Sequence, residues 1–196
     1  MNTGIVILAA GNSSRLGRPK QLLTFGDRTL LSIVMEEALE TSYRPILVVT
    51  GAYATEITEI HEHPEVTYVY NTSWESGMAS SIVKGISAIL DININLENII
   101  LAVADQVMIH AKIFEKLQEK HQITGKDIVA CSYAETIGTP VLFNKKYFSK
   151  LLQLRGEAGA KKLLLQYPSD IELIKFENGE IDIDTEADYK NLISKQ

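Results

Sequence analysis

Short runs of consecutive apolar residues alternate along the chain with longer amphipathic stretches. Apolar runs that no polar residue interrupts are typical of strands buried on both faces of a parallel sheet. The runs that predict strands are 4–9, 45–50, 66–70, 98–104, 127–132, 140–143 and 171–176. Apolar stripes with helical spacing predict helices around residues 30–39, 82–90, 113–117 and 163–167, and a last helix is expected over 185–194.

This alternation of strand and helix predicts right-handed βαβ units, and therefore an α/β fold with a doubly wound sheet. The pattern breaks between Cys131 and Phe143, where two extended segments follow one another. One strand there is expected to be antiparallel or to lie at the edge of the sheet. No repeat, low-complexity tract or linker divides the chain, so residues 1–196 are interpreted as one domain.

Composition and charge exclude several classes of protein. Hydrophobic residues make up 45% and charged residues 22% of the 196 residues, as in an ordinary globular protein. The net charge of −6 argues against a nucleic-acid partner. The first apolar run is too short to cross a membrane and follows no basic segment, so neither an anchor nor a signal peptide is predicted. Cys131 is the only cysteine, which favours a cytoplasmic location.

The segment directly after the first strand, residues 8–21, reads LAAGNSSRLGRPKQ. In doubly wound sheets ligands bind beyond the carboxyl ends of the strands. Glycines and small residues leave backbone N–H groups open to phosphate oxygens, and Arg15 and Lys20 can neutralise a triphosphate. The glycine spacing fits neither a Walker loop nor the pattern G-x-G-x-x-G. A polar surface loop is the alternative, because Gly, Asn and Ser favour loops in any case.

Acidic residues lie beside two of the predicted elements. Asp105 comes after an apolar run and is expected at the carboxyl end of a central strand, where a carboxylate can hold Mg²⁺. The alternative is that Asp105 only caps the next helix. Asp182 and Asp184 lie two residues apart, so an extended segment places them on one face. Thr185 and Asp188 have the spacing of a capping box that opens the last helix.

The loop resembles the signature LAAGxSxRxGxxK of the MobA-like nucleotidyltransferases, and the resemblance extends to about residue 190. It implies a Rossmann-like three-layer α/β/α sandwich with a mostly parallel sheet. In that family the loop wraps a nucleoside triphosphate, and the Arg and Lys that contact its phosphates are here Arg15 and Lys20. Ala10 is similar to members that use cytidine nucleotides, so the resemblance favours CTP over GTP.

Residues 71–81 resemble the family segment N-x-x-W-x-x-G-M-x-x-S, which lies against the base and ribose. Ala79 departs from the glycine that relatives often have. A helix N-cap with a packed Trp74 is the alternative interpretation. The expected nucleotide-binding residues are Leu8, Ala9, Ala10, Gly11, Ser13, Arg15, Lys20, Asn71, Gly77, Ser80 and Ser81.

The strings VADQV and DIDTEAD resemble the family's two metal-binding segments, although each lacks a proline that relatives have. The resemblance implies Mg²⁺ bound by Asp105 and Asp184, with Asp182 in support. The expected catalytic residues are Arg15, Lys20 and Asp105.

The resemblance implies transfer of a nucleoside monophosphate from CTP to a phosphate-bearing acceptor, with release of pyrophosphate. An ionised phosphate nucleophile needs no general base, since positioning and charge neutralisation suffice. Within the family the chain resembles the branch whose acceptor is molybdopterin, which implies transient docking to a molybdoenzyme. Segments 138–143 and 154–160 resemble its acceptor side, although both are also ordinary turn sequences. Two alternatives stay open: a cytidylyl- or guanylyltransferase for a sugar or polyol phosphate, and a non-catalytic cofactor-binding chaperone.

Two further features are interpreted as structural. His61 and His63 flank Glu62 without a third ligand nearby, so a solvated helix end is expected rather than a zinc site. Cys131 lies in an expected strand and is interpreted as a core residue rather than a nucleophile.

Overall fold

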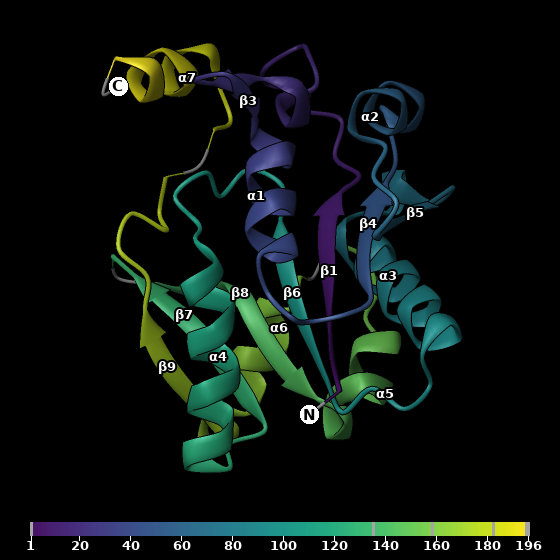
Figure 1. Cartoon of the computed structure of the whole chain (residues 1–196), viewed down its shortest axis with the longest axis vertical. Coiled ribbons are helices and arrows are strands. Elements are labelled where there is room, and N and C mark those ends of the chain that lie inside the picture. Colours follow the sequence, from purple (N-terminus) through teal and green to yellow (C-terminus); the bar gives the residue numbers. More distant parts are fainter. Residues whose placement is uncertain (1, 135, 158, 182, 195–196) are drawn as a thin grey trace.

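The structure is a computed structural model that describes residues 2–134, 136–157, 159–181 and 183–194. A seven-stranded sheet has the order β5-β4-β1-β6-β8-β7-β9, and helices cover both of its faces (Figure 1). Its strands are β1 (Thr3–Ala9), β4 (Ile46–Thr50), β5 (Val66–Tyr70), β6 (Asn98–Val103), β7 (Ile128–Tyr133), β8 (Thr136–Asn144) and β9 (Ile171–Lys175). A separate antiparallel pair consists of β2 (Thr24–Phe25) and β3 (Arg28–Thr29). The predicted α/β fold with a mostly parallel sheet is confirmed.

The helices form the two outer layers. One layer contains α1 (Leu30–Leu39), α2 (Ala54–His61) and α4 (Ala111–Thr124), and the other contains α3 (Met78–Ile92), α5 (Phe148–Leu152) and α6 (Lys161–Gln166). The last helix, α7 (Glu186–Ile193), lies beyond one end of the sheet. Short 3-10 turns are η1 (Lys20–Leu22), η2 (Trp74–Ser76), η3 (Lys145–Tyr147) and η4 (Pro168–Asp170). Within the described ranges, no helix has the length and apolarity that a membrane span requires.

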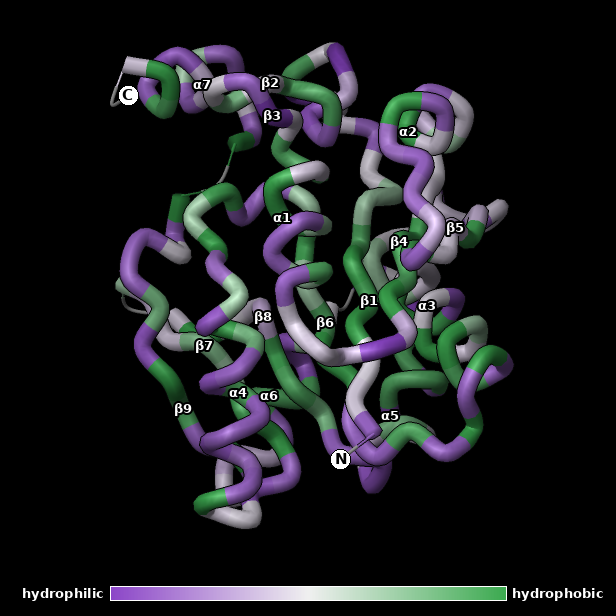
Figure 2. Tube along the Cα trace, viewed as in Figure 1, coloured by the Kyte–Doolittle hydropathy of each residue, from purple (hydrophilic) through white to green (hydrophobic). Residues whose placement is uncertain are grey.

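The uninterrupted apolar runs are explained by burial on both faces of the sheet. Ile5, Val6 and Ile7 of β1 are all 0% exposed. Ile5 and Ile7 pack against the layer of α1 and α4, whereas Val6 packs against the layer of α3. Figure 2 shows the same arrangement as apolar strands enclosed between helices. A strand that contacts apolar layers on both sides does not need polar residues at alternate positions.

The break in the pattern after Cys131 corresponds to a hairpin. β8 pairs antiparallel with both β6 and β7, and β9 pairs parallel with β7 at the edge of the sheet. Of the two expected arrangements, the antiparallel strand is therefore the correct one. Only two residues separate β7 from β8, and so short a connection allows only antiparallel pairing.

The order of the strands brings two chain segments together. β1 lies between β4 and β6, and Leu8 of β1 is in register with Val103 of β6. The loops that follow β1 and β6 therefore begin side by side at the carboxyl ends of the strands. This is the switch point at which ligands bind in doubly wound sheets.

His61 is buried, contrary to the expectation of a solvated helix end. It is 7% exposed; its Nε2 lies 2.6 Å from Thr29 Oγ1 and its Nδ1 lies 3.0 Å from the Ile57 carbonyl oxygen. Burial lowers the pKa of its imidazole. The expectation was wrong because α2 ends against the start of α1 rather than in solvent. Cys131 is confirmed as a core residue, since it is 0% exposed and burial raises the pKa of its thiol to about 12.

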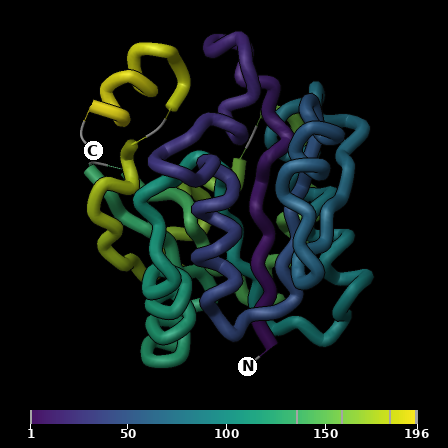
Figure 3. Tube along the Cα trace, turned by 45° about the horizontal axis from the view of Figure 1, so that its top comes forward, coloured from purple at the N-terminus to yellow at the C-terminus, as the bar shows by residue number. Residues whose placement is uncertain are grey.

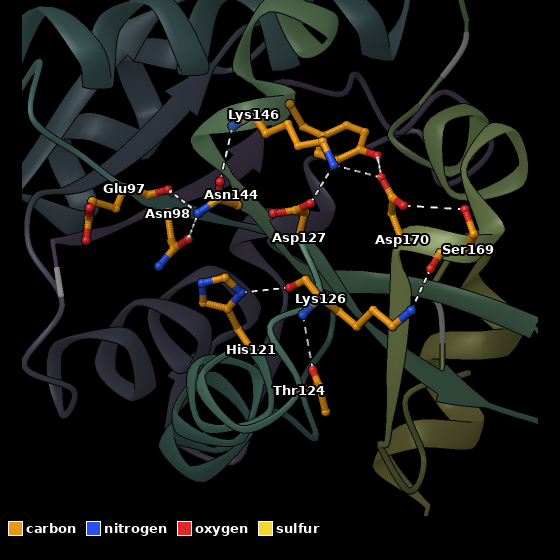
Figure 4. Close-up of polar contacts among 11 residues, drawn as sticks. Glu97, Asn98, His121, Thr124, Lys126, Asp127, Asn144, Lys146, Ser169 and Asp170 are labelled. Carbon is orange, nitrogen blue, oxygen red and sulfur yellow. Dashed lines mark hydrogen bonds and ion pairs between the residues drawn. The ribbon is translucent and has the colours of Figure 1, made fainter.

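A polar cluster connects three segments at the end of the sheet opposite to the carboxyl ends of β1 and β6 (Figure 4). Lys146 Nζ lies 2.7 Å from Asp127 Oδ2 and 3.2 Å from Asp170 Oδ2. The hydroxyl of Tyr147 also donates to Asp170. These contacts join the segment after β8 to those before β7 and β9.

We expect Asp170→Asn to lower the melting temperature at neutral pH, and the difference from wild type to disappear in acid. Hydrogen bonds from Tyr147 and Lys146 hold the pKa of Asp170 below its usual value. The contribution is therefore fully present above the unfolded-state pKa of about 3.9 and is lost as the pH falls through the lower folded-state pKa. Thermal unfolding followed by circular dichroism across this range tests the prediction. A difference that persists unchanged in acid contradicts it.

Candidate active site

The loop after β1 is shaped by its own backbone. The carbonyl oxygen of Ser13 accepts hydrogen bonds from the N–H groups of Leu16 at 2.9 Å and Gly17 at 3.0 Å. Gly17 has a φ of 75°, a conformation that glycine adopts without strain. Ser13 Oγ accepts a bond from the backbone N–H of Lys20 at 3.1 Å. Pro19 precedes η1, so the first helical turn starts at Lys20 rather than directly after Gly17.

Charged side chains from three distant parts of the chain meet at the carboxyl end of the sheet. Lys20 forms an ion pair with Asp105, and its Nζ lies 3.5 Å from Asp184 Oδ1. Arg15 Nη2 lies 2.5 Å from Asp184 Oδ2. Figure 3 shows the C-terminal segment and the loop after β1 at the same end of the sheet. Both carboxylates thus face the same ammonium group.

Asp105 does not cap the next helix. α4 begins at Ala111, and the residue in its N-cap position is His110. The Asp105 side chain is only 12% exposed and is directed to Lys20. The alternative that gave Asp105 a capping role is therefore wrong.

Asp184 is held in place by the start of α7. The predicted capping box is confirmed: Thr185 accepts a bond from the Asp188 N–H, and the Asp188 side chain accepts one from the Thr185 N–H. Arg18 Nη2 lies 2.7 Å from Glu186 Oε1. Ile183, next to Asp184, is fully buried in a third apolar cluster that includes Leu16, Leu23 and Leu192. Exposed ion pairs contribute only about 0–1 kcal/mol, so this apolar contact is the stronger anchor.

The segment between β5 and α3 forms a tight turn. Asn71 Nδ2 donates to Ser80 Oγ at 2.8 Å and to Ser81 Oγ at 3.0 Å. Gly77 has a φ of 95°, and a Cβ there would lie 2.7 Å from the Gly156 carbonyl oxygen. The residue at this position must therefore be glycine. Gly77 stands at the N-cap position of α3 and supplies no side-chain cap, so that part of the alternative is wrong. Trp74 does pack against an apolar core cluster, as the alternative expected.

These segments surround a cavity of about 880 Å³. The expected nucleotide-binding residues that line it are Leu8, Ala9, Ala10, Gly11, Arg15, Lys20, Gly77 and Ser81. Ser13, Asn71 and Ser80 are absent from its lining and instead bond the loops that form it. Asp105 and Asp184 also line the cavity, whereas Asp182 lies outside the described residues.

The other side of the cavity comes from residues outside the expected nucleotide and metal sites. Thr139 and Glu157 fall within the two acceptor-like segments, so a signal for them existed. Tyr133, Thr136 and Glu180 belong to no motif. The position of β8 between β6 and β7 brings Tyr133 and Thr136 here, and Glu180 comes from the segment after β9.

The charge of the cavity and its oxygen donors fit a divalent cation. Its carboxylates are Glu75, Asp105, Glu157, Glu180 and Asp184, against the two cations Arg15 and Lys20. A bare triphosphate would be repelled by this excess of negative charge, and a divalent cation reduces the repulsion. Mg²⁺ is usually held by one or two carboxylates together with phosphate oxygens. Asp105 and Asp184 supply that number, and the described residues contain no larger metal-binding cluster of His, Cys, Asp or Glu.

Known proteins share the sequence pattern and the fold of this chain. Residues 5–171 match the MobA-like NTP transferase domain. Molybdenum cofactor cytidylyltransferase of Escherichia coli K12 is 26% identical over 94% of this chain and 92% of its own length. Nicotine blue oxidoreductase of Paenarthrobacter nicotinovorans is 30% identical over 86% of this chain and 84% of its own.

Similarity of structure extends over the whole chain. The crystal structure of Rv0371C from Mycobacterium tuberculosis H37Rv in complex with manganese covers 100% of both chains, with a TM-score of 0.82 and 22% identity. The sheet order, the loop after β1 and the extent of the sequence match lead to one assignment. The chain belongs to the MobA-like NTP transferase family.

Proposed function

We propose that this protein transfers CMP from CTP to the phosphate of a molybdopterin-type acceptor and releases pyrophosphate. The observation that carries the proposal is the meeting of Arg15, Lys20, Asp105 and Asp184 in one cavity beside the glycine loop. The 26% identity to molybdenum cofactor cytidylyltransferase supports the nucleotide and the acceptor.

In this proposal the chain's own residues bind and orient the triphosphate. Backbone N–H groups of the loop after β1 face the phosphates, and Arg15 and Lys20 stabilise the charge that develops on the leaving pyrophosphate. Asp105 and Asp184 would hold Mg²⁺. The likeness to Rv0371C, whose structure was solved in complex with manganese, supports a divalent cation in general. When bound, the cation neutralises phosphate charge and orients the reacting groups.

The reaction needs no protein nucleophile. An ionised phosphate oxygen of the acceptor attacks the α-phosphorus, the bond from that phosphorus to the bridging oxygen breaks, and pyrophosphate leaves with the electron pair. The protein therefore supplies position and charge rather than proton transfer. The volume of about 880 Å³ lies near the upper end of ligand pockets, which favours two substrates bound side by side.

The same proposal implies a cellular location and a partner for the protein. We propose that the chain acts as one domain in the cytoplasm and docks transiently on a molybdoenzyme that receives the product. Neither nucleic acid nor a membrane is needed as a partner.

The test is pyrophosphate release measured with CTP or GTP, with Mg²⁺ present and with each acceptor in turn. We expect release with CTP and molybdopterin, and much slower release with GTP or with a sugar or polyol phosphate. Faster release with another pair identifies a different transferase of the same family. Acceptor binding without release in any combination identifies the cofactor-binding chaperone and contradicts the proposal.

A further inference from the structure

Gln21 lies beneath the loop that follows β1. The residue is 2% exposed and lines the cavity, and it follows Lys20 in the chain. Gln21 Nε2 donates to the Ala9 carbonyl oxygen at 3.0 Å and to the Gly11 carbonyl oxygen at 2.9 Å. One amide group therefore binds the carbonyl groups of the residues on either side of Ala10.

This arrangement requires the chemistry of glutamine. Carbonyl oxygens only accept hydrogen bonds, so the atom that faces both of them has to carry two N–H groups. A carboxamide supplies two N–H groups from one neutral nitrogen, which avoids the cost of burying a charge. Gln21 Oε1 is buried without a hydrogen-bond partner among the described residues. An unpaired buried carbonyl costs free energy, and this cost offsets part of what the two hydrogen bonds of Gln21 contribute to stability.

The two hydrogen bonds determine where the neighbouring N–H groups point. In a trans peptide the C=O and the following N–H point in opposite directions. With the carbonyl groups of Ala9 and Gly11 turned toward Gln21, the N–H groups of Ala10 and Asn12 point away from it. Both residues line the cavity, and neither N–H donates to another group in the described parts of the chain. These two donors are thus available to an anionic ligand.

We propose that Gln21 is a positioning residue: its amide turns the carbonyl groups of Ala9 and Gly11 away from the cavity and presents the N–H groups of Ala10 and Asn12 to a bound triphosphate. The inference rests on the proposed function, because that function supplies the triphosphate. In this arrangement the phosphates are bound by basic side chains and also by two uncharged backbone N–H groups, whose direction Gln21 determines.

Two variants test the role of Gln21. Gln21→Met keeps the length of the side chain and removes both donors, and Gln21→Glu replaces the donor with an acceptor. We expect calorimetry with CTP and Mg²⁺ to show binding about ten- to a hundredfold weaker in the Met variant, as is typical when bound groups are misplaced. Its melting temperature is expected to fall only modestly: the carbonyl oxygens of Ala9 and Gly11 lose their donor, but the unpaired Oε1 is removed at the same time. Gln166→Met, on the exposed face of α6, is the matched control.

The Glu variant adds a readout that a purely structural role would not move. A protonated carboxyl group again donates one hydrogen bond, and burial among carbonyl oxygens raises its pKa. The ratio of the Kd of the Glu variant to that of wild type is therefore expected to fall as the pH falls. Protonation of the triphosphate affects both Kd values equally, so its effect cancels in the ratio. This measurement decides the matter even if the Met variant fails to fold.

The failures of the two proposals are distinguishable. If wild type binds neither CTP nor inorganic triphosphate, the proposed function and the role of Gln21 both fall. If wild type binds CTP and the two variants bind it equally well at every pH, only the role of Gln21 falls.

Discussion

Replacing Asp105 with asparagine is expected to reduce pyrophosphate release at least about a thousandfold while the protein still folds. The Asp105 carboxylate is one of two that face Lys20 at the carboxyl end of the sheet. An amide keeps its size but removes the negative charge that a divalent cation requires. Metal ions supply several kcal/mol of transition-state stabilisation in such reactions, and each 1.4 kcal/mol is about a factor of ten.

Initial rates of pyrophosphate release and the melting temperature are to be measured together for this variant. Asp91→Asn, which changes an exposed carboxylate on α3, is the control for loss of charge alone. Turnover close to wild type in Asp105→Asn, with the fold intact, removes the metal role from this residue.

Replacing Lys20 with methionine is expected to change the affinities for nucleotide and metal in opposite directions. Lys20 contacts the two carboxylates that we propose as metal ligands, so it competes with a cation for them when no nucleotide is present. Without it, CTP binding is expected to weaken and Mn²⁺ binding in the absence of nucleotide to strengthen, each by at least about tenfold. Two unit charges about 4 Å apart near a protein surface interact by about 4 kcal/mol, so tenfold is a modest expectation after screening by solvent.

Free Mn²⁺ can be counted by electron paramagnetic resonance, and CTP binding can be followed by calorimetry. Lys84→Met removes an exposed ammonium group on α3 and serves as the control. Unchanged Mn²⁺ affinity in Lys20→Met contradicts the competition, and unchanged CTP affinity contradicts the place of Lys20 in the nucleotide site.

The sequence predicted the core of this site because the positions of buried strands, and of the loops that follow them, can be recognised from simple patterns. β1 and β6 are uninterrupted apolar runs, and residues just beyond such strands lie at the ligand-binding edge of a doubly wound sheet. Arg15, Lys20 and Asp105 were found on that ground. The position of Asp184 came from family resemblance, because the buried contacts of Ile183 that bring it to the loop leave no local pattern.

Other parts of the site depend on long-range packing that no motif records. The interrupted pattern after Cys131 indicated an irregular strand but not its insertion between β6 and β7, which places Tyr133 and Thr136 at the cavity. Gln21 lay inside the recognised loop, yet its role depends on two carbonyl groups that a sequence does not orient. The burial of His61 depends in the same way on contact between α2 and Thr29.

The central claim is that the glycine loop, Asp105 and Asp184 hold one metal-bound triphosphate. The most direct measurement is anomalous diffraction from crystals grown with Mn²⁺ and a non-hydrolysable CTP analogue. The account predicts a manganese peak in contact with both carboxylates and the triphosphate, with Lys20 moved from Asp105 to a phosphate oxygen. A triphosphate bound elsewhere, or a manganese peak away from Asp105 and Asp184, would contradict it.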